Sequence, residues 1–108
     1  MLKKENRLTV FGPKNKNTIT TPLFNLGIAS NDKGVSRFSF VVSKKVDARA
    51  TVRNKTRRRV RSIIEDMLGK IERGKDFAFY IKKDAAQANR DEISAELNRV
   101  LLNNNLFK

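Results

Sequence analysis

The sequence predicts an α+β fold, a single-domain α-β sandwich in which a small sheet is covered by helices. Three observations lead to this prediction. The chain has 108 residues, 39% of them hydrophobic, which is enough apolar material for one core but not for two. Some segments alternate apolar and polar residues as strands do, and others repeat apolar residues with helical spacing. Their order is strand, strand, helix, strand, helix, and we expect one domain over residues 1–108.

The chain begins with a polar and basic stretch, residues 1–17, that shows no helical period and is expected to form an extended basic arm. Residues 18–29 are richer in β-branched and apolar side chains, and Phe24, Leu26 and Ile28 alternate to one side. Because Pro22 indicates an interruption, we expect one or two strands in this segment.

Residues 30–34 have the composition of a turn, and residues 35–43 follow as a strand. Phe38, Phe40 and Val42 share one face of this strand. Since a short turn joins it to the preceding strand, we expect the two to pair as an antiparallel hairpin.

The next segment combines a helical apolar pattern with the densest positive charge of the chain. One arc of the predicted helix carries the apolar side chains Val60, Ile63, Ile64, Met67 and Ile71, with Val52 and Thr56 extending it backward. Arg53, Arg57 and Arg61 form a row beside this arc, and Asn54 and Arg58 form the next row. The helix is expected to end between residues 69 and 74, where two glycines interrupt the pattern.

The last third of the chain predicts a strand and a helix. Residues 76–82 form a short and nearly continuous apolar run, which is typical of a strand inside a sheet. Asn89 is the expected N-cap, with Glu92 three residues later, ahead of an apolar helical stripe. The tail at residues 103–108 is expected to fray.

The charge distribution indicates the kind of partner. The net charge is +13, and residues 1–61 hold 16 basic and three acidic side chains, whereas residues 62–108 hold eight of each. Residues 44–61 alone contain nine basic side chains and one acidic one, Asp47. Arginine outnumbers lysine there, and its planar fork of donors matches phosphate oxygens, which favours nucleic acid over a merely solvated basic face. A membrane-surface helix is disfavoured because it would leave the apolar face of the strands uncovered.

Protein-centred catalysis is disfavoured by the missing residue types. The chain has neither histidine nor cysteine, so it lacks the commonest general base, thiolate nucleophiles and the usual zinc ligands. We therefore expect no catalytic residues and no metal site in the protein itself. No apolar run approaches the roughly 20 residues that span a bilayer, and a cytoplasmic protein with no membrane partner is expected.

The segment around the basic helix resembles the bacterial ribonuclease P protein component. The resemblance rests on a strand ending in Val-Ser-Lys-Lys-Val at residues 42–46, followed by a short loop and the helix signature Arg-Asn-x-x-Arg-Arg-x-x-Arg at residues 53–61. The opening at residues 2–8 and the end at residues 105–108 also look like those of the family, so the likeness spans nearly the whole chain.

The resemblance implies an accessory protein subunit of an RNA-catalysed endoribonuclease that matures tRNA 5′ ends. Its partners would be the catalytic RNA and precursor tRNA, with Mg²⁺ held mainly by the RNA and no protein partner evident. Carried over by position, the residues that would bind RNA are Lys44, Lys45, Arg49, Arg53, Asn54, Arg57, Arg58 and Arg61. A cleft between sheet and helix would hold the 5′ leader near Lys45. The family fold also implies a split β-α-β unit with a left-handed crossover around the basic helix.

The chain departs from the family pattern after the opening residues. Family members usually continue with a first helix containing Asp-Phe-x-x-Val-Phe, whereas this chain has Thr-Val-Phe-Gly-Pro at residues 9–13. Gly12 and Pro13 oppose a continuous helix, so Phe11 is the substitute assigned to leader binding. Two alternatives to this function stay open: a structural RNA-binding protein such as a ribosomal one, and a DNA-binding module.

Overall fold

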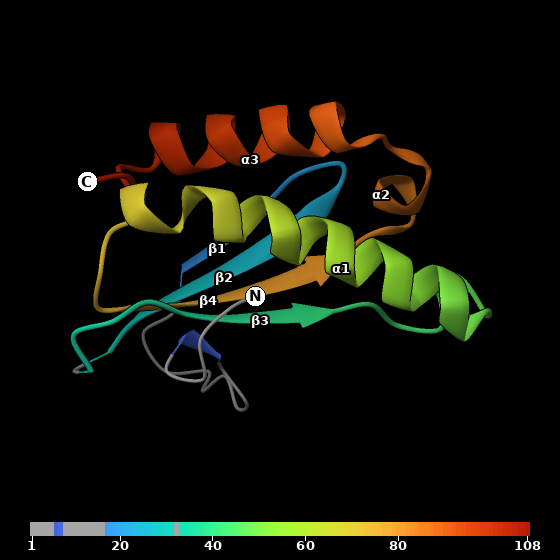
Figure 1. The fold of residues 1–108 in the computed structure, drawn as a ribbon, viewed down its shortest axis with the longest axis horizontal. Coiled ribbons are helices and arrows are strands. Elements are labelled where there is room, and N and C mark those ends of the chain that lie inside the picture. Colours follow the sequence, from blue (N-terminus) through green and yellow to red (C-terminus); the bar gives the residue numbers. More distant parts are fainter. Residues whose placement is uncertain (1–5, 8–16, 32) are drawn as a thin grey trace.

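The protein folds as two layers in the computed structural model, which describes residues 6–7, 17–31 and 33–108. One layer is a sheet and the other contains the helices, which lie over one of its faces (Figure 1). The strands are β1 (Asn17–Thr20), β2 (Phe24–Ser30), β3 (Arg37–Val41) and β4 (Lys75–Ile81). The helices are α1 (Ala50–Met67), the short 3-10 helix η2 (Leu68–Lys70), α2 (Lys83–Gln87) and α3 (Arg90–Asn103). The predicted α+β class, with helices covering one sheet face, is confirmed.

The sheet has the strand order β1-β2-β4-β3. The β1–β2 and β2–β4 pairs are antiparallel, and β3 pairs with β4 in parallel. The unit β3-α1-β4 therefore joins two neighbouring parallel strands through the basic helix, and β4 is the strand that separates β2 from β3. The left-handed crossover remains an expectation from the resemblance.

The predicted hairpin of β2 and β3 is wrong, because β4 lies between these strands. The turn exists and Gly34 adopts a left-handed φ of 72°, but the chain crosses the end of β4 instead of folding back beside β2. The Asn31 amide N–H donates to the Gly74 carbonyl at 2.8 Å, which ties this turn to the entry of β4. A strand that is apolar on nearly every residue is best buried in the middle of a sheet, and β4 takes that position.

A ladder of phenylalanines on the covered face accounts for the pairing of β3 with β4. Phe38 stacks on Phe77 and Phe40 stacks on Phe79, with ring centroids 5.2 and 5.5 Å apart. Phe24 of β2 meets the edge of Phe79 at 5.5 Å. Aromatic cross-strand pairs of this kind stabilise a sheet beyond the area that they bury. The predicted shared face of β3 is confirmed, because Phe38 and Val42 are buried and Phe40 packs against the core.

The final helix begins as the sequence predicts. The Asn89 side chain accepts from the Glu92 amide, and the Glu92 side chain accepts from the Asn89 amide, which completes a capping box. The predicted stripe of α3 is buried, with Ile93, Leu97, Val100 and Leu101 all nearly inaccessible. The short helix α2, which precedes α3, was not predicted.

The C-terminal tail is docked, so the prediction that residues 103–108 fray is wrong. Asn105 adopts φ 55° just after α3, and the Leu106 amide donates to the Leu101 carbonyl at 2.9 Å, which is the Schellman arrangement at a helix end. Leu106 then enters the core, and Phe107 pairs with Ile71 in an isolated β-bridge. The apolar residues after the Asn-Asn-Asn run hold the tail against the segment that comes after α1.

Of the predicted basic arm, the structure describes Asn6, Arg7 and Asn17. Asn6 is buried and its amide donates to the Ser36 carbonyl at 2.7 Å, and Arg7 forms a parallel bridge with Phe38. Asn17 is the first residue of β1. The rest of the predicted arm lies outside the described residues.

Candidate nucleic-acid interface

Helix α1 is held against the sheet by its apolar arc. Its buried residues are Thr56, Val60, Ile63, Ile64 and Met67, which is the arc expected from the sequence. The Thr56 hydroxyl donates to the Val52 carbonyl at 2.9 Å, so its polar atom is satisfied inside the helix. Ile71 is buried as predicted but follows η2, beyond the end of α1. The opposite side of the helix therefore faces away from the core in a fixed orientation.

The first turns of α1 reach beyond the end of the sheet (Figure 1). The N-cap residue Arg49 makes no side-chain capping hydrogen bond, and the first turn contains no acidic residue. The first backbone N–H groups of a helix have no intrahelical acceptor, and the helix dipole adds partial positive charge there. This end of α1 thus combines backbone donors with arginines, which suits phosphate oxygens.

Asp47 anchors the arginines at this end of the helix. Its carboxylate accepts from Arg49 Nε at 3.1 Å and Nη2 at 3.0 Å, and from the Arg49 amide at 2.8 Å. The hydrogen bonds from the Arg49 side chain and backbone lower the pKa of Asp47 from 3.8 to about 2. Arg53 Nη1 donates to the carbonyls of Asp47 and Ala48 at 3.0 and 2.8 Å. The loop before α1 and the first arginines are therefore locked together.

The Arg-Asn signature forms a second anchored group one turn further along. Arg57 Nη1 donates to Asn54 Oδ1 at 2.7 Å, and Arg58 Nε lies 3.4 Å from the Asn54 carbonyl. Each guanidinium has five N–H donors, so these contacts orient the group and leave further donors for a ligand. Arg61 lies 3.8 Å from Glu65 and extends the row. Asn54 thus positions its neighbouring arginines, a role that its place in the sequence does not reveal.

Arg59 lies in the middle of the arginine run but binds within the protein. Its Nη1 donates to the Ala88 carbonyl at 2.9 Å, where α2 ends. Arg90 of α3 similarly reaches Asp66 and Ser62 of α1, at 2.6 and 3.1 Å. These two arginines join α1 to the segment containing α2 and α3, and Arg59 was not among the residues predicted to bind RNA.

The predicted lysine pair lies on a turn between β3 and α1. Lys44 and Lys45 are exposed, while the valines on either side of the turn, Val42 and Val46, are buried. The Val46 amide donates to the Ser43 carbonyl at 3.0 Å and closes the turn. Two buried valines thus hold both lysines on the surface beside the start of α1.

The sheet face that points away from the helices carries an apolar pair that the sequence reasoning missed. Val41 and Tyr80 are direct partners in the β3–β4 register, and they are 42% and 40% exposed. The signal was available, because strict alternation with the buried Phe77, Phe79 and Ile81 places Tyr80 on the opposite face. Asn25, the partner of Tyr80 on β2, has a buried Oδ1 with no hydrogen-bond partner in the described part of the chain. Phe11, assigned to leader binding, lies outside the described residues.

Metal-ligating side chains do not cluster in the described part of the chain: no three of its Asp and Glu residues are placed to hold an ion. None of its helices is both long enough and apolar enough to cross a bilayer.

Known proteins resemble this chain in sequence and in fold. The family model described as Ribonuclease P matches residues 1–104. The ribonuclease P protein component of Microcystis aeruginosa is 34% identical over 74 residues, which cover 68% of this chain and 62% of that protein. The component of Bacillus cereus is 27% identical over 96 residues, covering 89% of this chain and 83% of that protein.

Solved structures share the fold. The RNase P protein of Staphylococcus aureus superimposes with a TM-score of 0.77 at 24% identity, over 88% of this chain and 86% of that one. The Thermotoga maritima RNase P protein gives 0.74 at 26% identity, over 82% and 83%. Because the family model matches almost the entire length, the chain belongs to the ribonuclease P protein family.

Proposed function

We propose that this protein is the protein subunit of a ribonuclease P, which binds the catalytic RNA and the 5′ leader of precursor tRNA in the cytoplasm. The observation that carries the proposal is the outer surface of α1. Its arginines are anchored through Asp47 and Asn54 on a helix whose other side is buried in the core. An arginine surface that is ordered before binding loses less conformational entropy when it meets phosphates.

The catalytic RNA is assigned to this arginine surface and to the lysine turn beside it. The residues are Lys44, Lys45, Arg49, Arg53, Asn54, Arg57, Arg58 and Arg61. Arginine contributes bidentate, charge-assisted hydrogen bonds to phosphate oxygens. A folded RNA offers closely spaced phosphates of that kind, and the net charge of +13 favours rapid encounter with it.

The 5′ leader is assigned to the sheet face that points away from the helices. Tyr80 supplies an aromatic surface on which an unpaired base can stack, and Val41 extends it across the strand register. The chain runs on from Val41 to the exposed Lys45 within four residues, so a single strand lying over Tyr80 would meet a cation at the edge of the sheet. Phe11 stays a further candidate for this path.

Cleavage itself is assigned to the RNA. The reaction is hydrolysis of one phosphodiester bond at the mature tRNA 5′ end, and Mg²⁺ would supply charge stabilisation there. Because the described carboxylates do not gather into a cage, we assign the magnesium ions mainly to the RNA partner. The protein would neutralise phosphate charge and position the leader.

Reconstitution tests the proposal. The chain is mixed with its cognate ribonuclease P RNA, and cleavage of precursor tRNA is measured at physiological magnesium concentration. Stimulated cleavage at the mature 5′ end supports the proposal and excludes a ribosomal protein. A chain that leaves cleavage unchanged but sediments with ribosomes would instead identify a structural RNA-binding protein.

A further inference from the structure

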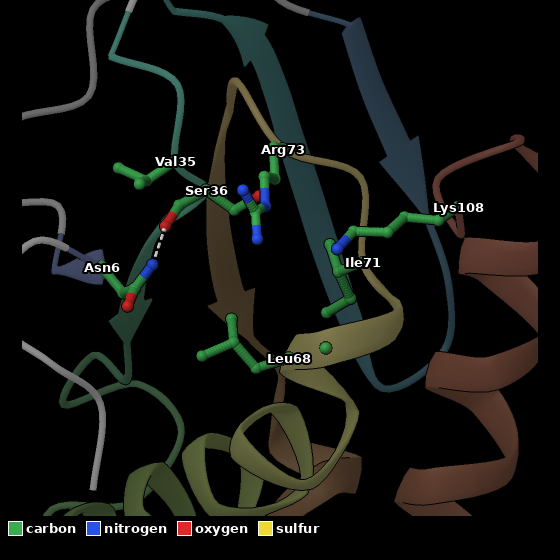
Figure 2. Close-up of a pocket in the computed structure, with 8 residues that line it drawn as sticks. Asn6, Val35, Ser36, Leu68, Ile71, Arg73 and Lys108 are labelled. Atoms are coloured by element: carbon green, nitrogen blue, oxygen red, sulfur yellow. Dashed lines mark hydrogen bonds between the residues drawn. The ribbon is translucent and has the colours of Figure 1, made fainter.

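A cavity of about 350 Å³ lies at the far end of α1 from the arginine surface. It is open to solvent on one side and is lined by η2, the segment after it, the entry of β3 and residue 108 (Figure 2). Its described lining residues are Asn6, Val35, Ser36, Leu68, Gly69, Ile71, Arg73 and Lys108. A volume of this size falls at the lower end of the range of small-molecule sites, roughly 300–1,000 Å³.

Two cations converge on this cavity. Figure 2 shows the Arg73 guanidinium and the Lys108 ammonium group pointing into the same space from different segments. Among the described residues, neither side chain has a hydrogen-bond or ion-pair partner, and none of the described lining residues has an acidic side chain. Two positive groups directed toward each other repel, so an anion between them would relieve an unfavourable interaction.

The remaining lining supplies an apolar surface and one amide. Leu68 forms an apolar side of the cavity with the buried Ile71 behind it, and Asn6 lies across from them. The Asn6 amide nitrogen is used by the Ser36 carbonyl at 2.7 Å, which leaves its Oδ1 as an acceptor for a ligand N–H. The site therefore suits a ligand with a negative group, a flat or apolar body and a hydrogen-bond donor.

We propose that this cavity binds a single nucleotide, with its phosphate between Arg73 and Lys108 and its base against Leu68. We take the nucleotide to be an unpaired unit of an RNA strand, a step that rests on the proposed function. The site is separate from the arginine surface, since Leu68 follows Arg57 by eleven residues, or about 17 Å along a helix axis. The protein would thus hold two separate RNA segments at the two ends of α1.

Nucleotide binding is tested by titrating the whole protein with uridine 5′-monophosphate, uridine or inorganic phosphate while amide NMR signals are recorded. The proposal expects the monophosphate to shift the signals of residues 68–73 and 108, phosphate to shift them less, and uridine least. Shifts confined to the first turns of α1, or equal shifts with phosphate and the monophosphate, would overturn the nucleotide assignment.

Two variants test the positive charge and the free volume of the cavity separately. R73Q/K108Q removes both cations and should weaken monophosphate binding by about tenfold or more. Gly69→Leu adds a side chain among the lining residues and should weaken binding while both cations remain. The position tolerates it, because a Cβ at Gly69 meets no atom within 4 Å and its φ is not positive. Lys83→Gln is the control, since this exposed lysine lies beyond the opposite end of β4.

A purely structural role gives a different result. Cations near a helix C-terminus also offset the helix dipole, so R73Q/K108Q would then lower the Tm and leave monophosphate affinity unchanged. That outcome, or unchanged affinity in Gly69→Leu, rejects the site.

A single-stranded oligouridylate distinguishes the source of the nucleotide. If it displaces the monophosphate from residues 68–73, an RNA strand is the ligand, whereas failure to displace it overturns the RNA assignment. An R57E/R58E variant should keep monophosphate binding. If that variant also keeps full affinity for the ribonuclease P RNA, the assignment of that RNA to the arginine surface fails and the cavity site does not.

Discussion

Reversing the charge of two arginines on α1 should separate RNA binding from folding. In the R57E/R58E variant each substitution lowers the net charge by two, from +13 to +9. Arg58 is exposed, and the hydrogen bond of the Arg57 side chain goes to Asn54 on the same helix, so the free energy of unfolding should change little. A hydrogen bond to a charged group contributes about 1.5–3 kcal/mol, so losing two should raise the Kd for the RNA subunit at least about a hundredfold.

The measurement is RNA affinity over a salt series, with thermal unfolding followed in parallel. If Arg57 and Arg58 each neutralise one phosphate, the negative slope of log K against log salt should become smaller in magnitude by about 1.4–1.8 in the variant. A K83E/R99E variant has the same net charge of +9 with both changes on other elements, and it should bind nearly as tightly as the native chain. Equal loss in both variants would refute a specific arginine surface and leave only general electrostatic attraction.

Three further predictions concern single residues. Tyr80→Ala should weaken binding of leader-containing precursor tRNA by about 1–3 kcal/mol relative to mature tRNA, as measured by competition, whereas Tyr80→Phe should not. Equal affinity of the two variants for precursor tRNA would remove Tyr80 from the leader path. Arg59→Ala should lower the free energy of unfolding by about 1–2 kcal/mol, since it leaves the Ala88 carbonyl without its donor, and should leave RNA affinity nearly unchanged in a binding titration. The pair of Asp47 with Arg49 should stabilise the fold fully above the unfolded pKa of 3.8 and lose that effect as pH falls toward 2. NMR titration of the Asp47 carboxyl checks this, and a midpoint near 3.8 would contradict it.

Short-range sequence patterns predicted the helices α1 and α3. The apolar arc of α1 could be predicted because residues three and four apart share a helix face. The start of α3 could be predicted because its capping box is an exchange of hydrogen bonds between nearby residues. The pairing of the strands could not be predicted from such short-range patterns. Phe38 and Phe77 are 39 positions apart in the chain and stack directly, whereas the turn after β2 pointed to a hairpin that does not form.

In the candidate site too, the sequence predicted residues from local patterns but did not predict their contacts. A family signature and charge density were enough to select Arg53, Asn54, Arg57 and Arg58, but not to show that Asn54 holds the Arg57 guanidinium. They left Arg59 out of the predicted set but did not reveal its partner, the Ala88 carbonyl 29 residues away. Tyr80 was missed because its strand reads as uniformly apolar, although alternation along the strand places it opposite the phenylalanines.

The sequence alone therefore determined the features that depend on short-range geometry: the class of fold, the face that α1 buries, and the side of the chain that carries the positive charge. Only the tertiary structure decided that β4 enters between β2 and β3, that Leu106 closes the core, and which arginines bind within the protein. The reason is physical, since helix faces and caps are set by residues a few positions apart. Strand order and side-chain partners depend on contacts between distant segments, which form when the whole core packs.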